Sequence, residues 1–343
     1  MTSVQNQQTA QAVSPAPIIE LVSGFRAAKF VMAASELGLF EALCEAPATI
    51  DVLATRVGLT RRAARICADA MVAVGLLDRH GDTYRNSALA ATYLAGATPE
   101  DLRPFIRFSD ASSYPAWTNL ADALRHGPSV KQITDLTPEL QKVFSEGVEA
   151  LNAGPAATLA ETADFTGCHR LLDVGGGTGS WSIAIARAHP HMTATVFELP
   201  QVADLARQRI AEQGLAGRIE TVSGDVLTAE LPAGHDCSLL ANVVHCFSPE
   251  DNQRLLAKVR RAVRPGTRLF LADYWTNPTH TEPVLAALMA GEYAVNVEDG
   301  DVYSLAEARE WLAATGWRFI ACEQIDGPKS VVVAEASESA GSR

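Results

Sequence analysis

The stretch Leu171–Leu172–Asp173–Val174–Gly175–Gly176–Gly177–Thr178–Gly179 joins an apolar run to a glycine-rich turn. A strand that leads directly into glycines and then into a helix is typical of nucleotide-binding sheets, because a backbone without Cβ atoms can approach a ligand closely. No Gly-Lys-Ser/Thr follows, which excludes a P-loop. Thr178 and Ser180 stand where the dinucleotide fingerprint G-x-G-x-x-G would need glycine, depending on the register. The remaining match is D-x-G-x-G-x-G, with Asp173 at the strand end.

A regular alternation of strands and helices surrounds this loop from His169 onward. The expected strands are Arg170–Val174, Thr193–Leu199, Ile219–Val222, Cys237–Val244, Arg268–Tyr274, Arg318–Gln324 and Ser330–Ala334. The expected helices are Gly179–Ala188, Gln201–Gln213, Pro249–Val263, Thr281–Asn296 and Leu305–Thr315. This alternation predicts an α/β fold with a Rossmann-like, doubly wound and mostly parallel sheet, whose ligands bind at the carboxyl ends of the strands.

Two further signals stand at those carboxyl ends. Glu198 ends the second strand, and Gly224–Asp225–Val226 follow the third. Together with the glycine loop they resemble the cofactor motifs of S-adenosylmethionine-dependent methyltransferases. The resemblance implies S-adenosylmethionine as the cofactor, with Glu198 accepting hydrogen bonds from the ribose hydroxyls and residues 224–226 near the adenine. The cofactor-binding residues that it implies are Asp173, Gly175, Gly177, Glu198, Leu199, Gly224, Asp225, Val226 and Ala241. A Rossmann-like domain for another nucleotide is the alternative.

A histidine follows the fourth strand at the same edge of the predicted sheet. His245 comes after the apolar run of residues 239–244, and imidazole is well suited to removing a proton near neutral pH. Residues 171–334 resemble the small-molecule O-methyltransferases of the caffeic acid and hydroxyindole type. Among these, they most resemble the bacterial natural-product enzymes. The resemblance implies that His245 is the general base, although Cys246–Phe247 replace the usual Asp-Trp.

The same resemblance implies acids beside the histidine and a helix over the acceptor. Asp273 falls on the first acid and is the second predicted catalytic residue, whereas the second acid aligns with Val302, so Asp301 is its candidate substitute. The implied substrate-binding residues are Trp275, Met289, Glu292, Tyr293 and Asn296. Core packing is the alternative for Met289 and Tyr293. No metal is predicted, because no spacing supports a site built from His245, Asp273 and Glu292.

The chain before residue 160 has a different character, with apolar residues at helical spacing. Thr49 and Thr60 stand at expected N-caps, and a hairpin between Leu77 and Tyr84 completes the outline of a winged helix. The predicted parts are a disordered terminus (1–17), a helical domain with a winged-helix-like part (18–160), the cofactor-binding domain (161–336) and a disordered end (337–343). The family resemblance implies that the helical domain mediates dimerisation. The helix expected over Pro17–Phe40 is apolar enough to need a second subunit, which predicts a homodimer.

The composition restricts the classes of macromolecule that the protein is expected to bind. The chain has 343 residues and a formal charge of −12, which disfavours nucleic acid and anionic membranes. Arg61, Arg62 and Arg65 keep a winged-helix regulator as an alternative. Six cysteines without metal-ligand spacing indicate a reducing compartment, and neither a signal peptide nor a membrane span is recognised, which predicts a cytoplasmic protein.

The combined prediction is an S-adenosylmethionine-dependent O-methyltransferase. Its expected acceptor is a hydroxyl of an aromatic or polyketide-like small molecule in secondary metabolism, such as antibiotic biosynthesis. C-methylation and an S-adenosylmethionine-dependent hydroxylation on the same scaffold are the alternatives from other reaction classes.

Overall fold

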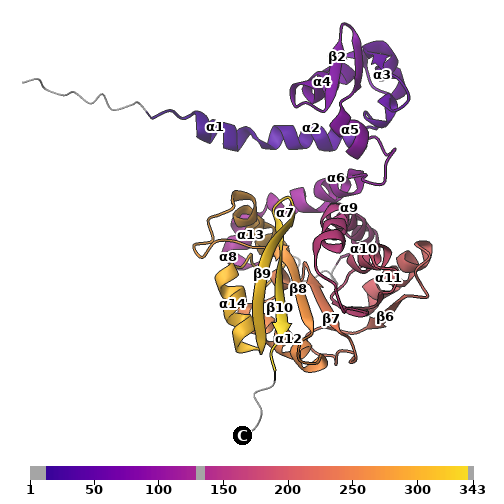
Figure 1. Cartoon of the computed structure of the whole chain (residues 1–343). Helices are drawn as coiled ribbons and strands as arrows, with labels where there is room; N and C mark the ends of the chain where they lie inside the picture. The colour runs from indigo at the N-terminus through magenta and orange to yellow at the C-terminus, as the bar shows by residue number, and fades with distance from the viewer. Residues whose placement is uncertain (1–12, 129–135, 339–343) are drawn as a thin grey trace, which may run out of the picture. The chain divides into compact units, whose positions relative to one another are not determined.

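The computed structural model describes residues 13–128 and 136–338 (Figure 1). The chain divides into two compact units, one ending at Asp101 and one beginning at Leu102. This division differs from the boundary expected near residue 160, because α9 (Pro138–Thr162) packs against both α6 (Arg103–Phe108) and α10 (Ser180–Ala188) of the second unit. The termini expected to be disordered lie largely outside the described residues, although α1 already begins at Ala16.

The first unit combines short helices with a small antiparallel sheet. Its elements are α1 (Ala16–Ser23), α2 (Phe25–Glu36), β1 (Ala48–Thr49), α3 (Ile50–Arg56), α4 (Arg61–Ala73), β2 (Leu77–His80), β3 (Thr83–Asn86) and α5 (Ala88–Tyr93). Two helices followed by a hairpin agree with the expected outline. Thr60 caps α4, since its Oγ1 accepts a hydrogen bond of 3.2 Å from the Ala63 amide, whereas Thr49 holds the N-cap position of α3 without such a bond. The helix expected over Pro17–Phe40 is two helices that meet at Gly24.

A seven-stranded sheet organises the second unit. Its strands are β4 (Arg170–Val174), β5 (Thr193–Glu198), β6 (Ile219–Ser223), β7 (Cys237–Ala241), β8 (Arg268–Tyr274), β9 (Trp317–Asp326) and β10 (Lys329–Ala336), in the order β6-β5-β4-β7-β8-β10-β9. Only β10 runs antiparallel to its neighbours β8 and β9, which confirms the predicted mostly parallel sheet. The chain leaves β4 toward β5 and β6 and returns on the other side at β7. The carboxyl ends of β4 and β7 therefore form the switch point where such sheets bind ligands.

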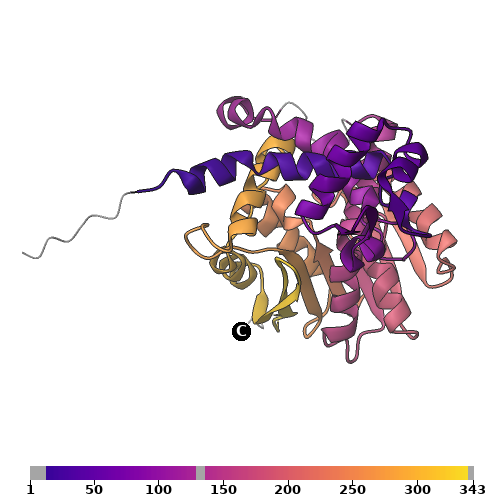
Figure 2. The same ribbon diagram turned by 90° about the horizontal axis from the view of Figure 1, so that it is seen from above.

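Helices cover both faces of this sheet, and the yellow strands β9 and β10 lie at one edge (Figure 2). Leu171 belongs to the core with α9, α10 and α11 (Pro200–Glu212), whereas Leu172 belongs to the core with α12 (Pro249–Ala262) and α14 (Leu305–Ala314). Successive side chains of a strand point to opposite faces, so one apolar run fills both cores.

Two glycines of α9 allow neighbouring elements to approach this helix closely. A Cβ at Gly147 of α9 would overlap the Cβ of Phe108 on α6, and one at Gly154 would lie 2.7 Å from Asp326 Oδ2. A π-helical turn (Ser109–Ser113) leads into α7 (Tyr114–Trp117) and α8 (Leu120–His126), which pack against α13 (Val284–Asn296). Within the described ranges, no helix is long and apolar enough to cross a membrane.

Candidate active site

The glycine loop makes a tight turn between β4 and α10. Gly175, Gly177 and Gly179 have φ angles of +70°, +56° and +81°, a left-handed conformation that favours glycine. A Cβ at Gly176 would lie 2.6 Å from the Asp173 carboxyl carbon, so the loop also needs glycine there to fold over Asp173. A Cβ at Gly177 would meet no atom within 4 Å. The loop is therefore open on the side of Gly177, where a ligand can reach the backbone.

Asp173 supports this turn from below. The carboxylate is fully buried, and its Oδ2 accepts a hydrogen bond of 2.6 Å from the Ser182 hydroxyl on α10. The pKa of Asp173 is raised to about 7, mainly by burial and in part by the charge of Glu198, whereas the hydrogen bonds from Ser182 oppose the shift. Asp173 thus fixes the loop to α10 rather than facing the open side.

Glu198 connects the loop to the ends of β5 and β6. Its Oε2 accepts a bond of 2.8 Å from the Gly177 amide, and its Oε1 accepts one of 2.7 Å from the Leu199 amide. The Glu198 carbonyl also accepts a bond of 2.9 Å from the Gly224 amide. A carboxylate has about four acceptor positions, so Glu198 can still accept bonds from two hydroxyl groups. A ribose ring beside Gly177 therefore fits the chemistry of these residues.

The other predicted cofactor residues lie around this edge in different environments. Asp225 accepts bonds from the Leu227 amide at 2.8 Å and the Thr228 hydroxyl at 3.1 Å, which fix the turn after β6. Val226 and Ala241 are buried, one in each core of the sheet. The three signals found in the sequence are thus brought together at the carboxyl ends of neighbouring strands.

His245 and Asp273 form a buried pair on the other side of the switch point. His245 lies in a 3-10 turn (Val244–Cys246) after β7, and its Nδ1 is 2.7 Å from the Asp273 Oδ1 at the end of β8. The His245 side chain is 12% exposed and that of Asp273 is 1% exposed. Burial disfavours the imidazolium, but the charge and hydrogen bond of Asp273 outweigh burial and raise the pKa of His245, with Cys246 adding to the shift. With Nδ1–H donated to Asp273, the neutral ring presents its lone pair at Nε2.

An aromatic ring from α13 covers the imidazole. The Tyr293 ring stacks on the His245 ring with centroids 4.0 Å apart and planes 15° apart. Burial raises the pKa of the Tyr293 hydroxyl well above its usual value, and the Asp273 charge adds to this. Met289 packs in the same small cluster. Tyr293 is therefore a neutral, flat surface against the histidine.

Glu292, the residue before Tyr293, anchors α13 to residues before and within α7. Its Oε2 accepts hydrogen bonds from the Ser113 hydroxyl at 2.8 Å and from the Trp117 indole N–H. Its Oε1 accepts one of 2.9 Å from the Asn296 amide. The sequence singled out Glu292 and Asn296 but missed Ser113 and Trp117, because nothing in residues 109–117 indicates contact with a helix so distant in sequence.

Trp275 is separated from this group. Its indole N–H donates to the Ser330 carbonyl at 3.2 Å, and the ring is buried in the core with α12 and α14. The structure gives Trp275 a packing position rather than one beside His245.

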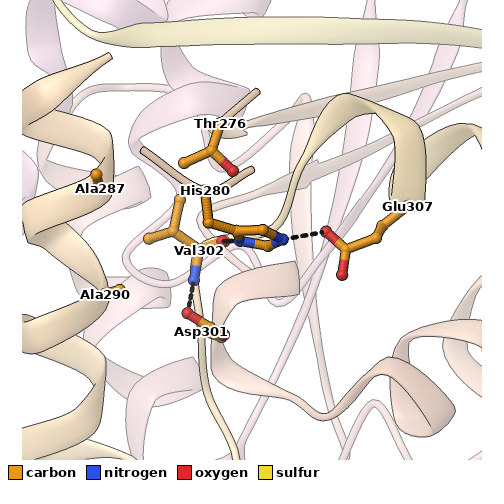
Figure 3. Close-up of a pocket in the computed structure, with 7 residues that line it drawn as sticks. All are labelled: Thr276, His280, Ala287, Ala290, Asp301, Val302 and Glu307. Carbon is orange, nitrogen blue, oxygen red and sulfur yellow. Dashed lines mark hydrogen bonds and ion pairs between the residues drawn. The ribbon is translucent and has the colours of Figure 1, made fainter. Parts of the chain in front are cut away.

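A cavity of about 330 Å³ lies beside α13, which contributes Ala287 and Ala290 to one side of it (Figure 3). It is lined by Thr276, His280, Ala287, Ala290, Asp301, Val302 and Glu307. The Asp301 amide donates to the His245 carbonyl at 3.1 Å, but its carboxylate accepts from the Val302 amide at 2.7 Å. Asp301 thus contacts the backbone of the histidine, and its carboxylate is bonded to Val302 instead of the imidazole.

A buried lysine near the pair was also missed from the sequence. Lys329 at the start of β10 donates to the side-chain oxygens of Asn152 and Asn242, the latter at 2.6 Å. Asn242 has a φ of +57°, uncommon for a residue other than glycine. Burial lowers the pKa of Lys329 to about 8, although the Asp273 charge raises it. Only the fold brings α9, β7 and β10 together, so no local pattern could reveal this network.

The sheet order, the glycine loop joined to Glu198, and a His–Asp pair at the switch point define a class of protein. They are the features of a Rossmann-like methyltransferase that uses S-adenosylmethionine.

Comparisons with known proteins identify the family. Residues 117–318 match the O-methyltransferase domain, and residues 19–96 match the O-methyltransferase dimerisation domain. The chain belongs to the O-methyltransferase family. It is accordingly an enzyme whose cofactor is S-adenosylmethionine.

Relatives show the range of this family. The chain is 33% identical to a 3-hydroxy-5-methyl-1-naphthoate 3-O-methyltransferase of Streptomyces sahachiroi over 88% of this chain and 89% of the relative. It is 31% identical to the N,N-dimethyltransferase OxyT of Streptomyces rimosus over 95% and 96%. The crystal structure of the S-adenosylmethionine-dependent methyltransferase SibL, in its apo form, matches with 31% identity and a TM-score of 0.79 over 95% of this chain and 100% of SibL.

Proposed function

We propose that this methyltransferase acts on a hydroxyl group of an aromatic small molecule of secondary metabolism, with His245 as its general base. The observation that carries the proposal is the buried His245–Asp273 pair under the Tyr293 ring, at the ligand edge of the sheet. The relative that methylates a hydroxynaphthoate supports an aromatic acceptor.

The proposed chemistry divides between two groups of residues. Gly177 and Glu198 bind the cofactor, which supplies, when bound, a methyl group made electrophilic by its sulfonium. His245 takes the proton from the acceptor hydroxyl at Nε2, and Asp273 stabilises the resulting imidazolium through Nδ1. Removal of a proton by a placed base contributes roughly 10²–10⁴-fold to the rate.

The residues of α13 hold the acceptor in this proposal. Tyr293 offers a flat neutral surface, and Glu292 fixes the helix by its bonds to Ser113 and Trp117. Correct orientation of the acceptor reduces the entropy cost of reaching the transition state. This effect can lower the activation free energy by roughly 7–11 kcal/mol. Glu292 is therefore assigned the role of positioning α13 against the acceptor, and Asp273 that of orienting His245.

The proposed working form is a homodimer, which the match to the dimerisation domain supports. The proposed location of the enzyme is the cytoplasm.

Product analysis tests the proposed reaction. Purified enzyme is incubated with S-adenosylmethionine carrying a deuterated methyl group and with a panel of phenols, and the products are examined by mass spectrometry and NMR. The expected product carries one deuterated methyl group on oxygen. A product that gains an oxygen atom would identify a hydroxylase, and a panel that stays unmodified would contradict the aromatic-acceptor proposal.

Transfer to nitrogen or carbon is the second candidate, and the similarity to an N,N-dimethyltransferase favours testing it. The same panel therefore includes aromatic amines and phenols with an unsubstituted neighbouring carbon. Labelled methyl on nitrogen or carbon, with none on oxygen, would replace the O-transfer assignment.

A further inference from the structure

Two cysteines and an aspartate lie close together at the amino end of the sheet, opposite the carboxyl ends that carry the glycine loop and His245. The sulfur atoms of Cys168 and Cys237 and a carboxylate oxygen of Asp236 all lie within 4.8 Å of one another. Cys168 is 3% exposed and Cys237 is fully buried. Cys168 precedes β4 and Cys237 begins β7, two strands that pair side by side with Leu171 opposite Cys237.

Asp236 is oriented for a ligand by its backbone contacts. Its Oδ1 accepts bonds of 2.8 Å from the amides of both His169 and Arg170, and the Asp236 amide donates to the Arg170 carbonyl at 3.0 Å. The second oxygen, Oδ2, is 3.7 Å from the Nδ1 of His169. One oxygen thus fixes the carboxylate, while a carboxylate oxygen lies within 4.8 Å of both sulfurs. The His169 Nδ1 also lies 3.2 Å from the Gly167 carbonyl, outside the cluster of sulfurs and carboxylate.

We propose that Cys168, Cys237 and Asp236 bind a thiophilic divalent cation of the zinc type, and that the 65% exposed His169 side chain rotates to supply the fourth ligand. Two sulfurs, one carboxylate oxygen and one imidazole nitrogen are all donor types that zinc accepts. Donor atoms of a tetrahedral zinc site with sulfur ligands are about 3.8 Å apart, so the described cluster needs to contract by about one ångström or less. Binding displaces the thiol protons to solvent, because the thiolate is the ligand.

The site has a structural role in this proposal. It connects the segments before β4 and β7, whereas the glycine loop and His245 follow the carboxyl ends of the same strands. Zinc should therefore stabilise the fold, because a ligand that binds only the folded chain shifts the unfolding equilibrium. The rates of methyl transfer should change little.

Metal titration of the reduced, full-length protein tests the site. Co²⁺ serves as the spectroscopic probe, and the expected result is one equivalent bound per chain with thiolate-to-cobalt charge-transfer absorption that Zn²⁺ abolishes. Zn²⁺ should also raise the melting temperature in a concentration-dependent manner. Absence of the absorption, or a melting temperature that does not respond to Zn²⁺, would overturn the proposal.

Variants separate this site from other thiols. Cys168→Ser and Cys237→Ser should lose the charge-transfer band, and Asp236→Asn should weaken Co²⁺ binding by more than about tenfold. Cys67→Ser, at a buried thiol of the first unit, is the matched control and should bind Co²⁺ like the wild type. If Cys237→Ser does not fold, Cys168→Ala tests the same ligand set. Retention of the band in either Cys168 variant would contradict the site.

Discussion

At the scale of single residues, His245 is expected to serve chemistry and not cofactor binding. His245→Ala should lower kcat by at least about 10² while leaving the dissociation constant of S-adenosylmethionine within a few fold. The loss should be smaller for acceptors already ionised at the assay pH, because these need no base. Steady-state rates over a series of phenols, with calorimetry of cofactor binding, check this. Equal losses across the series would mean that His245 positions the acceptor.

The pairing of His245 with Asp273 predicts a shift in the pH profile. Since Asp273 raises the pKa of His245, the fraction of neutral histidine, and with it kcat, should rise as pH increases through that raised pKa. Asp273→Asn removes the charge, so the pKa of His245 should fall and the rising limb should move to lower pH, with a lower plateau. Profiles of kcat against pH for both proteins measure this. An unmoved limb would show that another group controls ionisation.

Glu198 is expected to affect cofactor binding rather than the methyl-transfer step. Glu198→Ala should weaken S-adenosylmethionine binding more than about tenfold, because hydrogen bonds to a charged group contribute roughly 1.5–3 kcal/mol each. Glu220→Ala, at a neighbouring strand, is the control. Calorimetry showing wild-type affinity for Glu198→Ala would remove the ribose assignment.

Residues were predictable where one element carries the whole signal. Asp173, Glu198 and His245 each end a strand or follow one, so the alternation of elements located them. Lys329 and Trp117 were not predictable, because each meets its partners only after distant segments pack. Trp275 was placed with the acceptor on resemblance, but its indole ring turns into the core.

At the scale of elements, strand limits followed from apolar runs, and β4 and β8 have the bounds that the sequence predicts. The strand expected over Cys237–Val244 ends instead at Ala241, because Asn242 leaves the extended conformation with its φ of +57°. An apolar run continues through residues 243–244 because these side chains pack in the core with α12. Hydrophobicity alone therefore cannot mark the end of a strand when the following turn is also buried.

The contact between α6 and α9 depends on a glycine. Gly147→Ala should lower the free energy of unfolding by about 1–3 kcal/mol, since the new methyl group overlaps Phe108 and overpacking outweighs the gain in helix propensity of at most about 1 kcal/mol. Gly217→Ala, in the turn before β6 where a Cβ meets nothing within 4 Å, is the control for an added methyl group without overlap. Urea denaturation measures both. Equal stability of the two variants would show that α6 moves aside without cost.

At the scale of the whole molecule, α1 presents an apolar surface that we expect a second subunit to bury. Leu21 and Val22 are 83% and 70% exposed in the single chain. Changing both to Glu should convert the dimer into monomers, because burying two carboxylates without partners is strongly unfavourable. Sedimentation at micromolar concentration measures this, with Ile320→Glu on β9 as a control that should remain dimeric. A wild-type protein that sediments as a monomer would contradict the homodimer.

The anchoring of α13 has a consequence for how such an enzyme can diversify. The His245–Asp273 pair, our proposed base and its partner, lies at the ends of β7 and β8. The ring stacked on His245 comes from α13, which Glu292 fixes to Ser113 and Trp117. Substitutions along α13 can therefore reshape the space offered to an acceptor without disturbing the His245–Asp273 pair. Selection for a new natural product can act on the residues of one helix, and the resulting enzyme keeps the same reaction chemistry.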